Sequence, residues 1–435
     1  MEIEGSGAVA VLGLEGFVLR AAVEEHGELW QLVETTATLV GCPGCGTRAR
    51  SKGRTTTEVR DMACGGRPVR LAWRKRRWRC PDPDCDTKTW TEATGAIAPR
   101  AALTERARRD ICTRVGRDAA SVAALAREYG VAWSTAVAAV VAVGRPLVED
   151  PDRIGSVRAL GMDETSFLAA TAEHPTTYIT GLVDLDRRRL LDVVEGNRAV
   201  DVGRWLAGRG DEWRAGVDVV CCDPHEGYRS AASAQLSGAT LVADPFHITA
   251  VANRALDDTR RRVQQRTLGH RGRKADPLYR VRRVLLTGGE RLSERGWERL
   301  EAGLVAGDPD DEVLDAWLAK EHVRDIYLTT DAAEAARLLD KAIAFCEASH
   351  VHEVQRLGRT LARWYHEILA HHSTGASNGP TEALNLLVKK VKRVGHGHRS
   401  FANYRIRLLL HCGVAWPPPP AAGLRPHPRR QRRAA

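Results

Sequence analysis

The sequence predicts a mixed α/β domain with a large helical insertion, preceded by a cysteine-containing module and a helix-turn-helix. Three observations lead to this prediction. From Val157 the expected elements are three strands in a meander, then helix, strand, helix and strand, an order typical of a mixed sheet. After His247 the chain stays helical and basic until a fresh helix covers 378–394. Two cysteine pairs and an Ala-rich helical segment lie upstream of the strands.

Length and composition indicate a folded, multidomain protein. At 435 residues the chain is too long for one ordinary core, and it is 43% hydrophobic and 28% charged. No apolar run reaches the ~18 residues that a membrane span needs. The acidic start, MEIEGSGAVAVLGLEG, lacks the basic region of a secretory signal. We therefore expect a cytoplasmic protein without membrane association.

The net charge favours a polyanionic partner. It is +10 with a pI of about 9.3, and phosphate contacts by basic side chains drive sequence-independent binding to nucleic acid. A bland alternative stays open, because the tail at 425–435, RPHPRRQRRAA, supplies several of the charges.

Four of the cysteines form two pairs, Cys42-x2-Cys45 and Cys80-x4-Cys85. Four thiolates are a set that a structural zinc ion takes in tetrahedral geometry, and CPGCG matches the tight turn of a zinc knuckle. Four unrelated buried cysteines are the alternative. Between the pairs, TTTEVRDM and PVRLAWRKRRWRC are two β-prone runs around ACGGR, which predicts a hairpin. The arginines of the second run suit contact with a DNA backbone, although a solvated strand face explains them almost as well.

The segment 121–144, SVAALAREYGVAWSTAVAAVVAVG, has the rhythm of a helix-turn-helix. Ala126 allows close helix packing, and Gly130 four residues later suits the turn. The first turn of the second helix usually faces the major groove, so DNA contacts are expected from Trp133, Ser134 and Thr135. An ordinary helical hairpin is the alternative, since Ala-rich helices mimic this spacing.

The α/β region contains the strand 157–162, a hairpin at 176–196, and buried strands ending at Asp223 and Asp244. In a sheet of this order the first and fourth strands lie side by side at the centre. We divide the chain into an N-terminal segment (1–40), a zinc-binding module (41–95), a helix-turn-helix domain (100–145), a catalytic core in two parts (156–250 and 376–413) separated by a helical insertion (251–375), and a disordered basic tail (414–435).

Three carboxylates from distant positions are expected to meet at this sheet. Asp163 is predicted to end the first strand, Asp223 ends the fourth, and Glu382 lies in the first turn of the helix at 378–394. Such acids repel one another unless divalent cations neutralise them. Two Mg²⁺ (or Mn²⁺) ions roughly 4 Å apart can clamp a phosphodiester.

The stretches GMDETSF, CCDPHEGYR, VADPFHI and NGPTEALNLLVKKVKRVGHGHRSF, with the upstream cysteine knuckle and helix-turn-helix, resemble bacterial insertion-sequence transposases of DDE type, in the ISL-three group. The resemblance extends from Cys42 to about Cys412. It implies a ribonuclease H-like sheet and places the catalytic triad on Asp163, Asp223 and Glu382.

Other residues have competing roles. Asp244 with His247 could place a fourth acid near the metals or could cap the next helix; we favour Asp223 as the second ligand. Asn385, Lys389 and Arg393 share the face of Glu382 and are predicted to contact DNA. Glu164 is predicted to be solvated or to support a ligand rather than bind metal.

The resulting hypothesis is a transposase that binds the terminal inverted repeats of its element, cleaves them and joins them to target DNA. Two ends must be brought together, so at least a homodimer is expected. The alternative is a non-catalytic zinc and helix-turn-helix regulator derived from a transposase. A nuclease for branched DNA is disfavoured by the helix-turn-helix.

Overall fold

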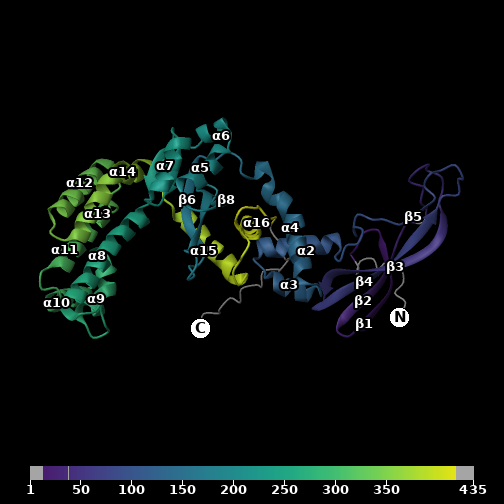
Figure 1. The fold of residues 1–435 in the computed structure, drawn as a ribbon, viewed down its shortest axis with the longest axis horizontal. Coiled ribbons are helices and arrows are strands. Elements are labelled where there is room, and N and C mark those ends of the chain that lie inside the picture. The colour runs from purple at the N-terminus through teal and green to yellow at the C-terminus, as the bar shows by residue number, and fades with distance from the viewer. Residues whose placement is uncertain (1–12, 38, 418–435) are drawn as a thin grey trace, which may run out of the picture. The chain divides into compact units, whose positions relative to one another are not determined.

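The computed structural model describes residues 13–37 and 39–417, drawn in Figure 1. Most of the predicted N-terminal segment is included, whereas nearly all of the predicted disordered tail lies outside the described residues. The chain forms two compact units, one of residues 1–153 with 390–435 and one of Ile154–Lys389. Within the described ranges, no single helix is both long and apolar enough to cross a membrane; only two helices joined at a 112° bend pass that test together.

The first unit contains a five-stranded sheet. Its strands are β1 (Phe17–Glu25), β2 (Glu28–Thr35), β3 (Arg50–Cys64), β4 (Arg67–Arg79) and β5 (Thr89–Thr91), in the order β1-β2-β4-β3 with β5 on β4. The hairpin predicted between the cysteine pairs is β3–β4, and its turn has positive φ at Gly65 and Gly66. The β1–β2 hairpin was not predicted, because residues 1–40 show only a short alternating apolar pattern, and most of β1 is exposed.

Helices complete this unit: α2 (Glu105–Arg117), α3 (Val122–Glu128), α4 (Trp133–Glu149) and α16 (Phe401–Cys412). The turn between α3 and α4 contains Gly130 at φ +62°, and the two helices meet at 112°. α4 continues to Glu149, through a Gly- and Pro-containing stretch whose composition favours a linker. Packing explains the difference, since Gly144 lies so close to α16 that a Cβ there would be 2.8 Å from Leu410 Cδ1.

The second unit is built on a mixed sheet, as predicted. The strands β6 (Ala159–Leu168), β7 (Thr177–Asp184), β8 (Arg189–Glu195), β9 (Val219–Cys222) and β10 (Thr240–Ala243) follow the order β10-β9-β6-β7-β8. The β6–β7–β8 meander is antiparallel, whereas β9 and β10 run parallel to β6. The first and fourth strands are therefore neighbours, as the element order indicates.

One detail of the first strand was predicted wrongly. Asp163 does not end β6, which continues to Leu168 because it stays paired with β7. The parallel neighbour β9 does stop here, with Met162 paired to Cys222 as the last rung. Asp163 thus lies at the edge where the parallel part of the sheet ends, next to the residue that follows β9.

Three helices accompany this sheet in the second unit: α5 (Ala199–Ala207), α6 (Asp211–Ala215) and α7 (Glu226–Gln235). Leu160 and Met162 of β6 are fully buried in a core that includes Leu206 of α5 and Tyr228 of α7. Burial of such side chains, worth about 1.5–3 kcal/mol each, fixes the strands that present the acids.

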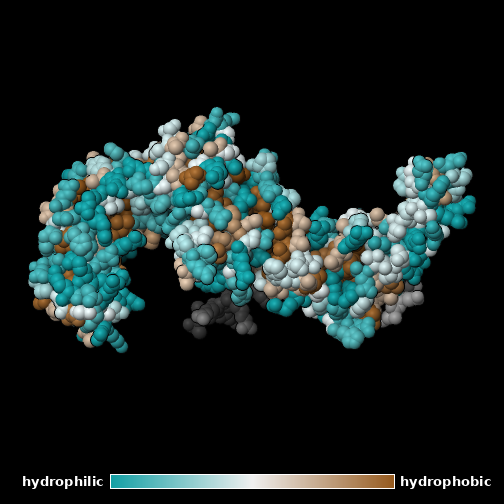
Figure 2. All heavy atoms as spheres, in the orientation of Figure 1, coloured by the Kyte–Doolittle hydropathy of each residue, from teal (hydrophilic) through white to brown (hydrophobic). Residues whose placement is uncertain are grey.

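The helical insertion, green in Figure 1, comprises α8 (Pro245–Leu268), α9 (Pro277–Leu286), α10 (Glu294–Gly307), α11 (Glu312–Ile326), α12 (Ala332–Ala348), α13 (His352–Arg363) and α14 (Tyr365–Thr374). It has its own apolar core. Arg262 of α8 donates hydrogen bonds to Glu353 of α13 at 2.7 Å and to Glu312 of α11 at 3.0 Å, which links these three helices. Over the face in Figure 2, hydrophilic residues predominate and hydrophobic ones gather in small patches. The chain then enters α15 (Gly379–Val394).

Candidate active site and metal centres

The four predicted zinc ligands form one cluster in the first unit. The sulfur atoms of Cys42, Cys45, Cys80 and Cys85 all lie within 4.8 Å of one another. Cys42 Sγ is 3.6 Å from Cys85 Sγ, and Cys45 Sγ is 3.5 Å from Cys80 Sγ. All four thiols are free, which makes them available as thiolate ligands.

Local backbone geometry builds this cluster. In the first knuckle Gly46 N donates to Cys42 O at 2.8 Å, and Gly46 has a φ of +75°. A Cβ on Gly44 would lie 2.7 Å from Thr87 Oγ1, so only glycine fits where the two knuckles face each other. Hydrogen bonding to Thr47 lowers the pKa of Cys45 to about 7, which favours its thiolate form.

A second cluster lies at the sheet edge of the other unit. One group is Asp163, Asp223 and His247, whose ligand atoms all lie within 4.8 Å of one another. Asp244, His247 and Glu382 form another group within the same limit. The imidazole of His247, from α8, belongs to both groups, so four acids from β6, the β9 end, the β10 end and α15 converge on it.

Two buried polar residues fix the start of α15 over the sheet. Asn378 N donates to Asp244 Oδ1 at 2.7 Å, and Asn378 Nδ2 donates to Met162 O at 3.2 Å. Thr381, equally buried, packs against β6. A Cβ on Gly161 would collide with the Thr381 hydroxyl and would lie 2.6 Å from Leu185 Cδ2. Gly161 therefore permits the close approach that places Glu382 at the acidic cluster.

The acids of this cluster carry unfavourable charge. Burial, followed by the nearby Asp223 carboxylate, raises the pKa of Asp163 to about 7. Burial, followed by Asp244, also raises the pKa of Glu382. For His247 burial acts against protonation, but the hydrogen bond and charge of Asp223 outweigh it and raise the pKa. The protonated form of His247 is therefore favoured by the acids around it, and it offsets part of their charge.

Asn385 contacts Asp163 directly. Its amide nitrogen donates to Asp163 Oδ2, and its oxygen accepts from the Thr165 hydroxyl at 3.2 Å. The backbone N–H of Glu164 donates to Asp163 Oδ1 at 2.7 Å. Both Asp163 oxygens thus have fixed donors. The predicted contact of Asn385 with DNA stays a prediction.

The remaining predicted residues lie apart from the acids. The Glu164 carboxylate accepts from Asn197 Nδ2 at 2.6 Å and belongs to neither group. Trp133 and Ser134 at the start of α4 are exposed and Thr135 is half-buried. Lys389 and Arg393 on α15 are exposed as well.

The donor sets fit the metals that the sequence suggests. Four convergent sulfurs match a structural zinc site. At the acidic cluster, Asp244 Oδ2 and Glu382 Oε1 are buried without a hydrogen-bond partner among the described residues, and carboxylate oxygens suit hard divalent cations. Asp244, the competitor of Asp223, lies in this cluster together with it.

Sequence reasoning underestimated His247 and missed Asn378 and Thr381. The signal for Asn378 and Thr381 was present in NGPTE, where these two hydrogen-bonding side chains flank the glycine and proline that start a helix. Their partners could not be read, because Asn378 and Met162 are separated by more than two hundred residues.

Comparison with known proteins gives two matching family models and several similar transposases. A transposase family model of the ISL3 (ISL-three) group matches residues 160–408, and a model for the zinc finger of the IS204, IS1001, IS1096 and IS1165 transposases matches 38–85. The chain is similar to the transposase of insertion sequence element IS1557 from two Mycobacterium tuberculosis strains. The identity is 27% over 302 residues, which is 65% of this chain and 66% of the relative. That match spans just under two thirds of the relatives' length. The IS1001 transposase of Bordetella parapertussis is 24% identical over 372 residues, 84% of this chain and 87% of the relative.

Proposed function

Because this chain belongs to the ISL3 group of DDE transposases, we propose that it binds the terminal inverted repeats of an insertion sequence and catalyses metal-dependent DNA cleavage and strand transfer. The convergence of Asp163, Asp223 and Glu382 on His247 supports the proposal most directly. The sheet order, with β9 beside β6, supports a ribonuclease H-like core split by the helical insertion.

The proposed reaction has two steps. A water molecule attacks a phosphodiester, the bond from phosphorus to the 3′ oxygen breaks, and a 3′-hydroxyl and a 5′-phosphate result. That hydroxyl then attacks a target phosphodiester, exchanging one ester for another. Two divalent ions, Mg²⁺ or Mn²⁺, when bound, supply activation of the attacking oxygen and stabilisation of the leaving oxygen.

The chain's own residues hold this site. Asp163, Asp223 and Glu382 would be the metal ligands, with Asp244 beside them. Asn385 orients Asp163 through its amide, and Thr165 fixes the amide by its hydroxyl. Fixed donors of this kind lower the reorganisation that a charged transition state requires.

DNA recognition is proposed mainly for the first unit, with further contacts from Lys389 and the helical insertion of the second unit. The α3–α4 pair fits a helix-turn-helix, with Trp133, Ser134 and Thr135 at the start of its second helix. The zinc module and the exposed Lys389 and Arg393 would contact phosphates, and the basic insertion would grip flanking DNA. Joining two ends requires at least a homodimer, acting in the cytoplasm where the DNA lies.

Asp163→Asn tests the proposal. The variant keeps the size of the side chain but removes a charged ligand, so Mg²⁺-dependent cleavage of a labelled inverted-repeat duplex should fall by more than a thousandfold while binding stays within twofold. Arg145→Gln, which removes a charge from an exposed ion pair on α4, serves as the control. A regulator without catalysis would show no cleavage by the unaltered chain, and that result would reject the enzyme.

A further inference from the structure

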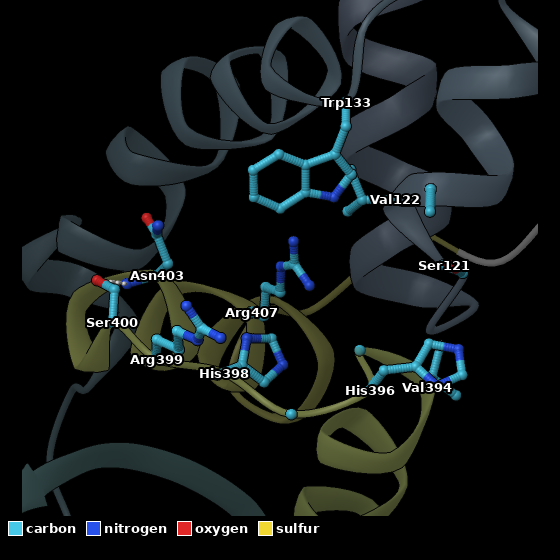
Figure 3. Close-up of a pocket in the computed structure, with 13 residues that line it drawn as sticks. Ser121, Val122, Trp133, Val394, His396, His398, Arg399, Ser400, Asn403 and Arg407 are labelled. Carbon is cyan, nitrogen blue, oxygen red and sulfur yellow. Dashed lines mark hydrogen bonds between the residues drawn. The ribbon is translucent and has the colours of Figure 1, made fainter.

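The first unit has a cavity of about 340 Å³, lined in part by Trp133, and apart from the DNA contact proposed for Trp133 none of the roles above involves it. Figure 3 shows Trp133 of α4 on one side of it and Arg407 of α16 pointing toward that ring. The segment 395–400 between α15 and α16 closes another side and turns through His396 and Gly397, both at positive φ. The volume of the cavity is at the lower end of the ~300–1,000 Å³ typical of small-ligand sites.

The charge in this cavity is positive. Arg407 and Arg399 line it, and no aspartate or glutamate is among the lining residues. Burial lowers the pKa of Arg407, and the described residues show no hydrogen bond or ion pair to its guanidinium. Arg407 is half-buried, and a partly desolvated charge without a protein partner is stabilised by an anion, so the cavity is suited to accept one.

The neighbouring histidine does not share this charge. Burial, followed by the charge of Arg407, lowers the pKa of His398 to about 4, so the ring is neutral near pH 7. It stacks on Tyr404 with ring centroids 4.7 Å apart. The positive charge is therefore concentrated on the two arginines. α16, whose first turn is capped by Ser400, adds the positive end of its dipole.

The opposite wall is apolar. Trp133 is 55% exposed although it is a large aromatic residue, and Val122 of α3 lies beside it in Figure 3. A wall that presents an indole opposite two guanidinium groups suits a ligand with a flat ring and an anionic group. A nucleotide has both, since bases stack on aromatic side chains and phosphates pair with arginine.

We propose that this cavity binds one unpaired nucleotide of a DNA strand, with its phosphate on Arg407 and Arg399 and its base against Trp133. The proposal rests on the proposed function for its source of DNA. The base must be unpaired, because a base inside a duplex is covered on both faces and cannot stack on the indole of a concave site. Strand ends and frayed positions near a cleavage site provide such nucleotides.

The test compares two DNA ligands by fluorescence anisotropy with the full chain. One is a blunt duplex, and the other is the same duplex with a three-nucleotide single-stranded extension carrying 2-aminopurine. The unaltered chain should bind the extended duplex about tenfold more tightly and quench its 2-aminopurine. Trp133→Ala should remove the quenching and most of that preference. Free deoxyadenosine monophosphate, added as competitor at millimolar concentration, shows whether a nucleotide outside a strand can occupy the cavity.

Arg407→Gln should weaken binding of the extended duplex about tenfold. It should also lower the slope of log binding constant against log salt concentration by about one, because one fewer counterion is released. Arg145→Gln is the matched control, because it removes an exposed guanidinium from α4, twelve residues after Trp133 and ~18 Å along the helix. Arg407→Lys, which keeps the charge, should retain most of the binding. Circular dichroism melts of each variant show whether α16 is still folded.

The proposal is overturned if Trp133→Ala weakens both duplexes equally, or if Arg407→Gln and Arg145→Gln have the same effect in folded protein. Displacement by the free mononucleotide with no preference for the extended duplex would also overturn it, in favour of a small-molecule site. If the unaltered chain bound neither duplex, that result would instead reject the proposed function. If the unaltered chain bound the blunt duplex and neither Trp133→Ala nor Arg407→Gln changed the affinity for the extended duplex, only this inference would be rejected.

Discussion

His247 Nε2 lies 2.8 Å from Asp223 Oδ1, so a histidine in the first turn of α8 reaches the acid that follows β9. The same nitrogen is 3.9 Å from Glu382 Oε1. A protonated imidazole between two carboxylates offsets part of their repulsion, and a divalent ion would do so more strongly. His247 thus occupies the electrostatic centre of the acidic cluster.

Replacing His247 by alanine should destabilise the metal-free protein. The change leaves the half-buried Asp223 carboxylate without its hydrogen-bond partner, which costs about 1–3 kcal/mol. Thermal melting in EDTA at pH 7 should show a decrease of a few degrees. Phe246→Ala, at the neighbouring exposed position, is the control. Equal melting temperatures for the His247 variant and the unaltered chain would contradict a compensating role.

Asp163→Asn should stabilise the metal-free protein above pH 7. The pKa of Asp163 is raised to about 7 in the folded state, so the unfolded chain loses this proton first and stability falls between about pH 4 and 7. The asparagine has no such cost, and its melting temperature should exceed that of the unaltered chain by several degrees at pH 8. The gap should close at pH 4. Added Mg²⁺ should raise the melting temperature of the unaltered chain only.

One equivalent of zinc should be bound by the four-cysteine cluster. Cys42→Ser removes one of four thiolates, so metal analysis should find well under one zinc per chain, and the module at 41–95 should become sensitive to proteolysis. Cys64→Ser is a matched control, because Cys64 is exposed at the end of β3 and outside the cluster. Full zinc content in the Cys42 variant would rule out this ligand set.

Gly161→Ala should separate α15 from β6. The added methyl group would meet Thr381 and Leu185, and overpacking of this kind costs about 1–3 kcal/mol. Both melting temperature and cleavage should fall, the latter because Glu382 moves with the helix. Gly203→Ala on α5 should be neutral or slightly stabilising, since a Cβ there meets nothing within 4 Å. Similar losses in the two variants would argue against the specific contact.

Asn385→Ala should lower cleavage about 10- to 100-fold and leave binding of inverted-repeat DNA within twofold. The amide holds Asp163 Oδ2, so its loss would free a proposed metal ligand whose position the proposed reaction requires to be fixed. Thr165→Val should give a smaller loss, because it only releases the amide from the other side. If affinity for DNA fell as much as cleavage in the Asn385 variant, a direct contact with the nucleotide would be the better explanation.

Local sequence patterns were sufficient for much of the architecture. The meander and the alternation of helix and strand predicted the mixed sheet, and they predicted β9 beside β6. The β3–β4 hairpin followed from β-prone runs around Gly65 and Gly66. The sequence missed the β1–β2 hairpin and the continuation of β6 past Asp163, because pairing partners, and not propensity, decide where a strand ends.

The sequence by itself determined which side chains could bind metal: four cysteines at knuckle spacing and a set of acids next to apolar runs. Residue type and local spacing are enough for that, since ligand chemistry belongs to the side chain. Only the tertiary structure decided that His247 joins Asp223 to Glu382, and that Asn378 and Gly161 position α15. These contacts link segments up to 216 residues apart, and their geometry depends on how the buried faces pack rather than on any local pattern.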